Sequence, residues 1–233
     1  MNEKDDLPAM TSSDVAAFNA AHARSYAEGP PRQVPGFAGL HRMTSMLLSE
    51  RVPPDGRVLV LGAGGGLELK ALADDHPGWT FDGIDPSADM LRVAEQIVGH
   101  HAARIHLHEG YIEAAPEGPF DGAACLLTLH FVSRDQRIET LKQIHRRLVP
   151  GAPFVVAHIS FPQGEPERSM WIDRHIAFGG TNPADAESAR RAIGTRLSIL
   201  SPEEDEAMLR KAGFSGVSLF YAGLSFRGWV GYA

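Results

Sequence analysis

The segment Val58–Gly66 constrains the fold of this chain more than any other stretch of its sequence. Its first four residues are apolar and two are β-branched, which is typical of a strand buried on both faces. Glycines follow at positions 62, 64, 65 and 66, and residues 67–72 then have the pattern of a helix. Because glycine adopts positive φ and lacks a Cβ, this strand–turn–helix unit lets a nucleotide-like ligand approach the backbone. We therefore expect a cofactor-binding α/β domain.

The spacing of the glycines separates two kinds of cofactor. A dinucleotide site has Gly-x-Gly-x-x-Gly, or alanine at the last position, because that small residue packs the helix on the strand. Here Gly62 and Gly64 match, but Leu67 occupies the sixth position and the third glycine comes one residue early, at Gly66. An NAD-linked oxidoreductase is therefore disfavoured, although it stays open as an alternative.

Asp85 ends the second predicted strand, 19 residues after Gly66. An acidic side chain at this place can accept hydrogen bonds from both hydroxyls of a ribose, whichever nucleoside cofactor is bound. The alternative is that Asp85 caps the helix that follows Pro86-Ser87. We favour ribose binding because of the glycine loop that precedes it.

Strand and helix patterns alternate from residue 57 to residue 160 and predict a doubly wound parallel sheet. Strands are expected at 58–61, 79–84, 104–108, 120–129 and 154–159, and helices at 67–72, 87–98 and 136–148.

Both ends of the chain are expected to add to this core. Residues 1–52 predict N-terminal helices, one from about residue 14 to Ala27 that stops at Gly29-Pro30-Pro31, and one over 38–51. Residues 161–200 predict a helical insertion without strands. Residues 201–233 predict a helix that begins at Ser201-Pro202 and an antiparallel hairpin of strands 217–221 and 225–232, which completes a seven-stranded, mainly parallel, Rossmann-like sheet in a single domain.

Composition excludes several classes of function. With 233 residues, 43% hydrophobic and 22% charged, the chain is expected to be a soluble globular protein. The net charge of −7 and the lack of a basic run make a nucleic-acid substrate unlikely on sequence grounds. No apolar run reaches the length of about 20 residues that spans a bilayer. Cys125 is the single cysteine, so no internal disulfide can form and a cytoplasmic protein is expected. No histidine or cysteine cluster has metal-ligand spacing, and the oligomeric state stays open.

Several motifs together resemble those of the class I S-adenosylmethionine-dependent methyltransferases. The resemblance runs from Arg57 to Tyr232 and rests on Gly62-x-Gly64-x-Gly66, Asp85-Pro86-Ser87-Ala88-Asp89-Met90-Leu91, the apolar segment Phe120–Phe131, the turn Arg147–Pro153 and Ala212-Gly213-Phe214. A parallel sheet that ends in an antiparallel hairpin is also typical of this family. The resemblance implies S-adenosylmethionine as cofactor and methyl transfer to a small-molecule acceptor by in-line attack.

The resemblance also implies which residues form the site. The expected cofactor-binding residues are Gly62, Ala63, Gly64, Gly66, Asp85, Pro86, Met90, Gly110, Tyr111, Ile112 and Leu126. His130 is the candidate general base, and His41, His158, Trp171, His175 and Tyr221 are candidates for the acceptor pocket. Spacing alone leaves two structural alternatives open, a core methionine for Met90 and a hydrogen-bonded strand-end histidine for His130.

Two positions depart from the family pattern. Val60 stands where many members have an acidic residue that meets the methionine ammonium group, and Tyr111 stands where an aspartate usually accepts from adenine, with Glu113 as a candidate substitute. A non-catalytic cofactor-binding module is therefore one alternative. Another is an enzyme similar to carboxy-S-adenosylmethionine synthases, because Val34-Pro35-Gly36-Phe37 resembles a motif of that branch. Enzymes of that branch use an arginine of the helical insertion to hold a carboxylate on the cofactor, and Arg190 or Arg191 is the nearest candidate here.

Overall fold

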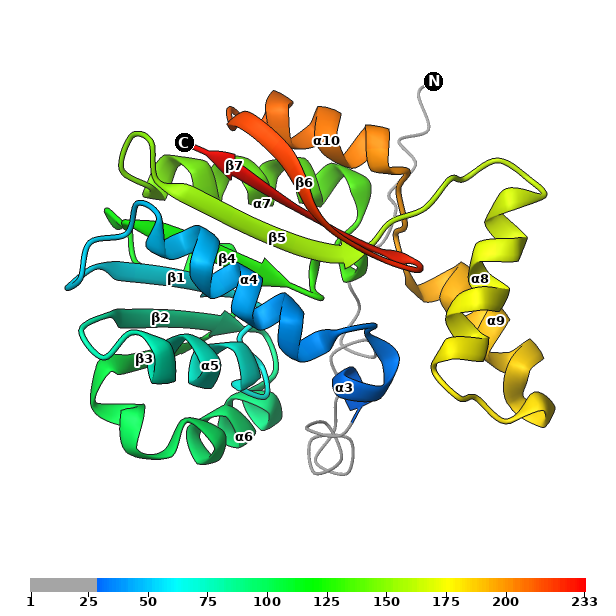
Figure 1. The fold of residues 1–233 in the computed structure, drawn as a ribbon, viewed down its shortest axis with the longest axis horizontal. Coiled ribbons are helices and arrows are strands. Elements are labelled where there is room, and N and C mark those ends of the chain that lie inside the picture. Colours follow the sequence, from blue (N-terminus) through cyan, green and yellow to red (C-terminus); the bar gives the residue numbers. More distant parts are fainter. Residues whose placement is uncertain (1–28) are drawn as a thin grey trace, which may run out of the picture.

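A computed structural model describes residues 29–233, so the helix expected at about 14–27 lies outside the described residues. Seven strands form one sheet in the order β3-β2-β1-β4-β5-β7-β6 (Figure 1). Strands β1 to β5 are parallel, and β7 is antiparallel to both β5 and β6. Their bounds are Arg57–Leu61, Thr80–Asp85, Ile105–Glu109, Gly122–Leu126, Pro153–Ile159, Ser215–Gly223 and Phe226–Tyr232 for β1 to β7. The predicted fold class is confirmed.

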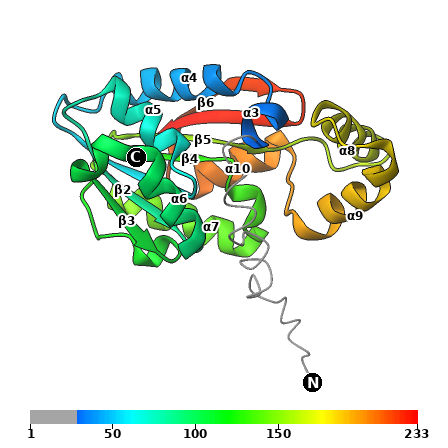
Figure 2. The same cartoon turned by 90° about the horizontal axis from the view of Figure 1, so that it is seen from below.

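Helices cover both faces of the sheet (Figure 2). The helix bounds are α3 Gly29–Gln33, α4 Phe37–Ser49, α5 Leu67–Asp75, α6 Ala88–Val98, α7 Arg134–Arg147, α8 Glu167–Phe178, α9 Ala186–Arg196 and α10 Pro202–Lys211. On one face, Leu48 of α4 and Leu69 of α5 pack with Val58 and Val60 of β1. On the other face, residues of α7 and α10 pack on Leu59 and on strands β4, β5 and β7. Because successive side chains of a strand point to opposite faces of the sheet, each strand contributes to two separate cores.

The fourth strand is shorter than the sequence predicts. It was expected over 120–129 but ends at Leu126, because Leu127 has φ 57° and so lies in the left-handed region, where a strand cannot continue. The Leu127 amide donates to the carbonyl of Ala157 on β5 at 2.6 Å, which fixes this conformation. A 3₁₀ turn over Leu129–Phe131 follows in place of the expected strand end.

The proline pair near the start of the described chain lies within a helix, whereas the helix that it is expected to end lies outside the described residues. Pro30 and Pro31 lie in the first turn of α3, which begins at Gly29. A proline is tolerated there because the first amides of a helix have no partner within the helix.

The topology places the site at one edge of the sheet. The strand order reverses between β1 and β4, and in such sheets ligands bind at this point, outside the carboxyl ends of the strands. The insertion helices α8 and α9 lie beyond the C-terminal end of β5 (Figure 1). In the part of the chain described here, no helix combines the length and the apolarity needed to cross a membrane.

Candidate functional site

The glycine loop 62–66 connects β1 to α5, and its amides are all used within the protein. Gly62, Gly65 and Gly66 have φ of 81°, 83° and 68°, which glycine alone adopts without strain. The amide hydrogen bonds are Gly62 to the Ile84 carbonyl (2.8 Å), Ala63 to the same carbonyl (3.0 Å), Gly64 to Asp85 Oδ2 (2.9 Å), Gly65 to the Met90 carbonyl (3.1 Å) and Gly66 to the Ala63 carbonyl (3.0 Å). A dinucleotide site uses such amides to bind pyrophosphate. This loop therefore suits a nucleoside ligand without phosphate groups.

Asp85 connects the glycine loop to the start of α6. Its Oδ2 accepts from the Gly64 amide and its Oδ1 from the Ser87 amide, both at 2.9 Å. Burial raises the pKa of this carboxyl group. The helix cap is Ser87, whose side chain accepts from the Met90 amide, so capping is not the role of Asp85. Each carboxylate oxygen keeps a further lone pair, which leaves Asp85 able to accept from ligand hydroxyls.

The loop fits tightly against Asp85 and against the end of β4. A Cβ on Gly64 would lie 2.5 Å from Asp85 Oδ2, and one on Gly62 would lie 1.9 Å from Thr128 Oγ1. No side chain beyond hydrogen can therefore occupy either position without moving the site. Leu127, next to Thr128, holds its left-handed conformation at this same junction, and strain of this kind often lies at functional sites.

The residues expected on the adenine side differ in exposure. Met90 is 3% exposed and Ile112 is 2% exposed, so both pack in the interior. Tyr111 is 46% exposed at the end of β3. Gly110 has φ 141°, and its amide donates to the Asp85 carbonyl at 3.0 Å, which joins this turn to the end of β2.

His130 is buried beside the end of β5. Its Nδ1 lies 3.4 Å from the amide of Ile159, which donates to it, so the neutral ring carries its hydrogen on Nε2. Burial, with the positive charges that His158, Arg137 and His175 can carry, holds the pKa of His130 well below its ordinary value. The ring is therefore neutral near pH 7.

The candidate acceptor-pocket residues fall into three places. Trp171, Tyr221 and the neighbours of His175 belong to one apolar cluster with the ends of β4 and β5, and His175 itself contacts Ser225 Oγ at 2.7 Å. His158 is 1% exposed on the opposite face, where its Nε2 lies 3.1 Å from Asp205 Oδ2. It therefore does not join the other pocket candidates.

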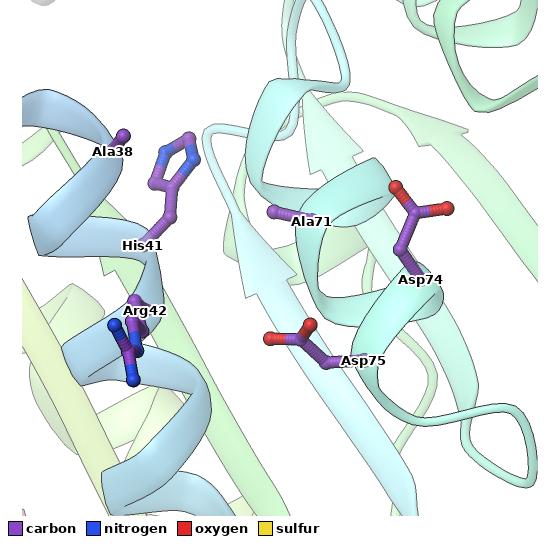
Figure 3. Close-up of a pocket in the computed structure, with 6 residues that line it drawn as sticks. All are labelled: Ala38, His41, Arg42, Ala71, Asp74 and Asp75. Atoms are coloured by element: carbon purple, nitrogen blue, oxygen red, sulfur yellow. The ribbon is translucent and has the colours of Figure 1, made fainter.

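His41 lies in a hollow of about 400 Å³ between α4 and α5 (Figure 3). The hollow is lined by Ala38, His41, Arg42, Ala71, Asp74 and Asp75. Burial lowers the pKa of His41 to about 4, so it is uncharged near pH 7. None of the residues that line this hollow is among the expected cofactor-binding residues.

Among residues 29–233, Asp74, His100 and His101 are close enough to share a metal ion. Two of these residues already have partners, because Asp74 Oδ2 lies 2.5 Å from Lys70 Nζ, Asp74 Oδ1 lies 2.6 Å from His101 Nε2, and His101 Nδ1 lies 2.9 Å from Arg104 Nη2. Asp74 and His101 therefore belong to an ion-pair network.

Comparison with known proteins identifies one domain of the chain. Residues 58–151, from β1 to the turn before β5, match the model of a methyltransferase domain. This part of the chain is therefore a methyltransferase domain. The cofactor of this family is S-adenosylmethionine, and the phosphate-free loop of this methyltransferase domain, with the Asp85 carboxylate beside it, fits that nucleoside.

Individual relatives agree with this family. The carboxy-S-adenosyl-L-methionine synthase of Pseudomonas syringae pv. tomato is 29% identical over 90% of both chains. Human N-acetylserotonin methyltransferase, solved with S-adenosylmethionine, has a TM-score of 0.61 and 17% identity, covering 95% of this chain and 56% of that one. An O-methyltransferase family protein from Burkholderia thailandensis has a TM-score of 0.61 and 16% identity, covering 95% of this chain and 60% of that one. The structural likenesses show the shared methyltransferase fold.

Sequence reasoning missed three features of this site. The first is Glu68, a buried carboxyl group in the first turn of α5. The second is the strained Leu127, for which the sequence carries no signal. The third is Arg137, which is fully buried beneath the insertion and was indistinguishable from the other charged residues of its helix.

Proposed function

We propose that this protein transfers a methyl group from S-adenosylmethionine to a small, partly apolar acceptor by direct in-line displacement. The observation that carries the proposal is the apolar cluster in which Ile172 and Ile176 of the insertion meet Leu126 and Ile159 at the strand ends. S-Adenosylmethionine supplies a methyl group on a sulfonium sulfur that is already a good leaving group. Holding acceptor and methyl group on one line is then the main requirement for catalysis.

The chain's own residues divide into roles toward the cofactor. We assign the ribose hydroxyls to Asp85 and the adenine faces to Met90 and Ile112, with Gly110 and the Tyr111 backbone at the ring edge. The methionine portion is assigned to the glycine loop, with Gly62, Ala63, Gly64 and Gly66, and to Leu126 at the end of β4. Pro86 sets the turn into α6. Calorimetric titration of single variants tests each assignment.

The acceptor class follows from what lines the cluster. Trp171, Tyr221 and Phe226 contribute aromatic surface, and the Arg227 guanidinium lies 5.6 Å from the centre of the Trp171 ring. Such a lining favours a flat, partly apolar molecule with one polar or anionic group. The net charge of −7 disfavours a nucleic-acid polymer.

A panel assay tests the proposed function. Purified protein is incubated with S-adenosylmethionine and small phenols, amines and carboxylic acids, and products are identified by mass spectrometry. We expect S-adenosylhomocysteine and an acceptor product heavier by one CH₂. Trp171→Ala should raise the acceptor KM by about tenfold, since burying an aromatic ring contributes on that scale. Met170→Ala, a change at an exposed neighbour, serves as the control. An unchanged acceptor KM in Trp171→Ala would contradict this pocket.

A second candidate function, carboxy-S-adenosylmethionine synthesis, is supported by the relatives of that name at 28–29% identity over 90% of the chain. Against it, Arg190 already pairs with Asp173 and with Glu187, so its charge is balanced within the insertion. Mass spectrometry of the ligand that copurifies with the protein separates the two candidates. A carboxylated cofactor in that fraction favours the second.

The His130 general-base assignment stays a prediction, and the geometry limits it. To accept a proton at Nδ1, the ring must first lose the hydrogen bond that the Ile159 amide donates to this atom. We therefore expect His130→Asn to lower kcat by less than about tenfold, against the 10²- to 10⁴-fold typical of a general base. A larger loss, accompanied by loss of a pH-dependent step in kcat, establishes the base role.

A further inference from the structure

Glu68 is a buried acid that the roles assigned above leave unused. It lies in the first turn of α5, directly after the glycine loop, and is 6% exposed. A carboxyl group buried to this extent needs a partner of opposite charge or a proton. Burial raises the pKa of Glu68 to about 8, so without a ligand the group is mostly protonated at pH 7.

Two titratable groups on neighbouring strands interact electrostatically with Glu68. Burial raises the pKa of Glu68 and that of Cys125 on β4, and smaller contributions come from Asp85, at the end of β2, to the pKa of Glu68 and from Glu68 to the pKa of Cys125. Strand β1 lies between β2 and β4 in the sheet. The carboxyl group is therefore within electrostatic reach of both neighbours of β1, next to the loop that β1 feeds.

The end of β1 has no acidic side chain of its own. Val60 is fully buried and packs in the same cluster as Leu69 of α5. Strand β1, Arg57–Leu61, therefore presents no carboxylate to the ligand. Glu68 instead presents one from the helix, where the dipole of α5 and a hydrogen bond from its own backbone amide favour negative charge. In a phosphate-binding loop, a phosphate group of the ligand occupies this position at the helix N-terminus.

We propose that Glu68 binds the α-ammonium group of the cofactor, in place of the carboxylate that β1 lacks. The inference rests on S-adenosylmethionine being the cofactor. An ammonium group brought to this buried carboxyl forms a charge-assisted hydrogen bond and stabilises the ionised form. Binding therefore releases the proton that Glu68 holds in the free protein.

Other charged groups on the neighbouring helices point elsewhere. His41 and Arg42 of α4 line the hollow between α4 and α5. Asp89 and Arg92 of α6 form a surface ion pair at 2.7 Å, with the arginine 66% exposed. Asp85 and the neutral Cys125 thiol are the titratable groups that interact with Glu68, and neither supplies a positive charge.

Calorimetry with two ligands tests the proposal. S-Adenosylhomocysteine carries the ammonium group, and 5′-methylthioadenosine has the same nucleoside without the amino-acid portion. We expect Glu68→Gln to weaken S-adenosylhomocysteine binding by about 10- to 100-fold, the scale of a charge-assisted hydrogen bond, and methylthioadenosine binding by less than about threefold. Glu95→Gln, an exposed change on α6, is the matched control.

Proton release gives a second readout that needs no variant. At pH 7 the enthalpy of S-adenosylhomocysteine binding to the native protein should vary with buffer ionisation enthalpy, corresponding to release of up to about one proton. Methylthioadenosine should release none. This comparison keeps the proposal testable even if Glu68→Gln does not fold.

The outcomes are distinguishable. If the native protein binds neither ligand, the cofactor assignment itself fails. If it binds both but Glu68→Gln weakens both equally, Glu68 has a structural role and the proposal is overturned. If S-adenosylhomocysteine binding releases no proton and its affinity is unchanged in Glu68→Gln, the ammonium group binds elsewhere and the proposal is overturned.

Discussion

Asp85→Ala is expected to weaken the binding of S-adenosylhomocysteine by about 1.5–3 kcal/mol, or roughly 10- to 150-fold in Kd. The carboxylate has two tasks, since it would accept from the ribose hydroxyls and it already accepts from the amides of Gly64 and Ser87. Removing it leaves those two amides without their partner and opens the turn on which the cofactor lies. The loss should therefore appear for every ligand that contains the ribose, including 5′-methylthioadenosine.

This last property separates Asp85 from Glu68. Asp85→Ala should affect both nucleosides about equally, whereas Glu68→Gln should affect only the ligand with an ammonium group. Asp85→Asn keeps one acceptor oxygen but turns an NH₂ group toward an amide donor, so we expect an intermediate loss. Asp89→Asn on the surface of α6 is the control. Wild-type affinity for methylthioadenosine in Asp85→Ala would refute ribose binding by this residue.

The parts of the site that sequence predicts are those fixed by local geometry. Glycines at 62, 64 and 66 must be glycines because of positive φ or close approach, and Asp85 follows from the strand that precedes it. Features that depend on distant partners escaped prediction. Leu127 is held by the Ala157 carbonyl, which belongs to another strand, and nothing in the local sequence marks its backbone.

His158 illustrates the same limit for side-chain direction. A histidine near the end of a strand can face either side of the sheet, and the sequence analysis grouped His158 with the acceptor-pocket residues. In the fold, His158 lies between α10 and β7, with its ring 5.6 Å from that of Trp229 and its Nε2 beside Asp205. Asp205 is 47 residues from His158 in sequence, so the pairing can be seen only in the folded protein.

Arg137 and Asp205 form the buried ion pair that connects α7 to α10. Arg137 Nη1 donates to Asp205 Oδ1 at 3.0 Å, and the two side chains are 1% and 2% exposed. Arg137 Nη2 also donates to the carbonyl of Val132, which follows β4, and to that of Ser198, which follows α9 at the end of the insertion. The guanidinium group thereby fixes the segment after β4 and the return of the chain from α9.

Arg137→Met is expected to lower the free energy of unfolding by about 3–5 kcal/mol, because it leaves the Asp205 carboxylate buried beside His158 without the guanidinium group that pairs with it. Urea denaturation measures this loss. The double variant Arg137→Met/Asp205→Leu should recover part of it, since apolar groups of similar volume can replace a buried ion pair.

The same two helices provide a matched control. Arg134 and Glu204 pair at 2.6 Å about one turn away, but with the arginine 57% exposed. Arg134→Met should therefore cost less than about 1 kcal/mol. Equal losses for Arg134→Met and Arg137→Met would contradict a special role for burial. A stable Arg137→Met variant would show that the carbonyls of Val132 and Ser198 find other donors, and that the insertion is held by its apolar contacts alone.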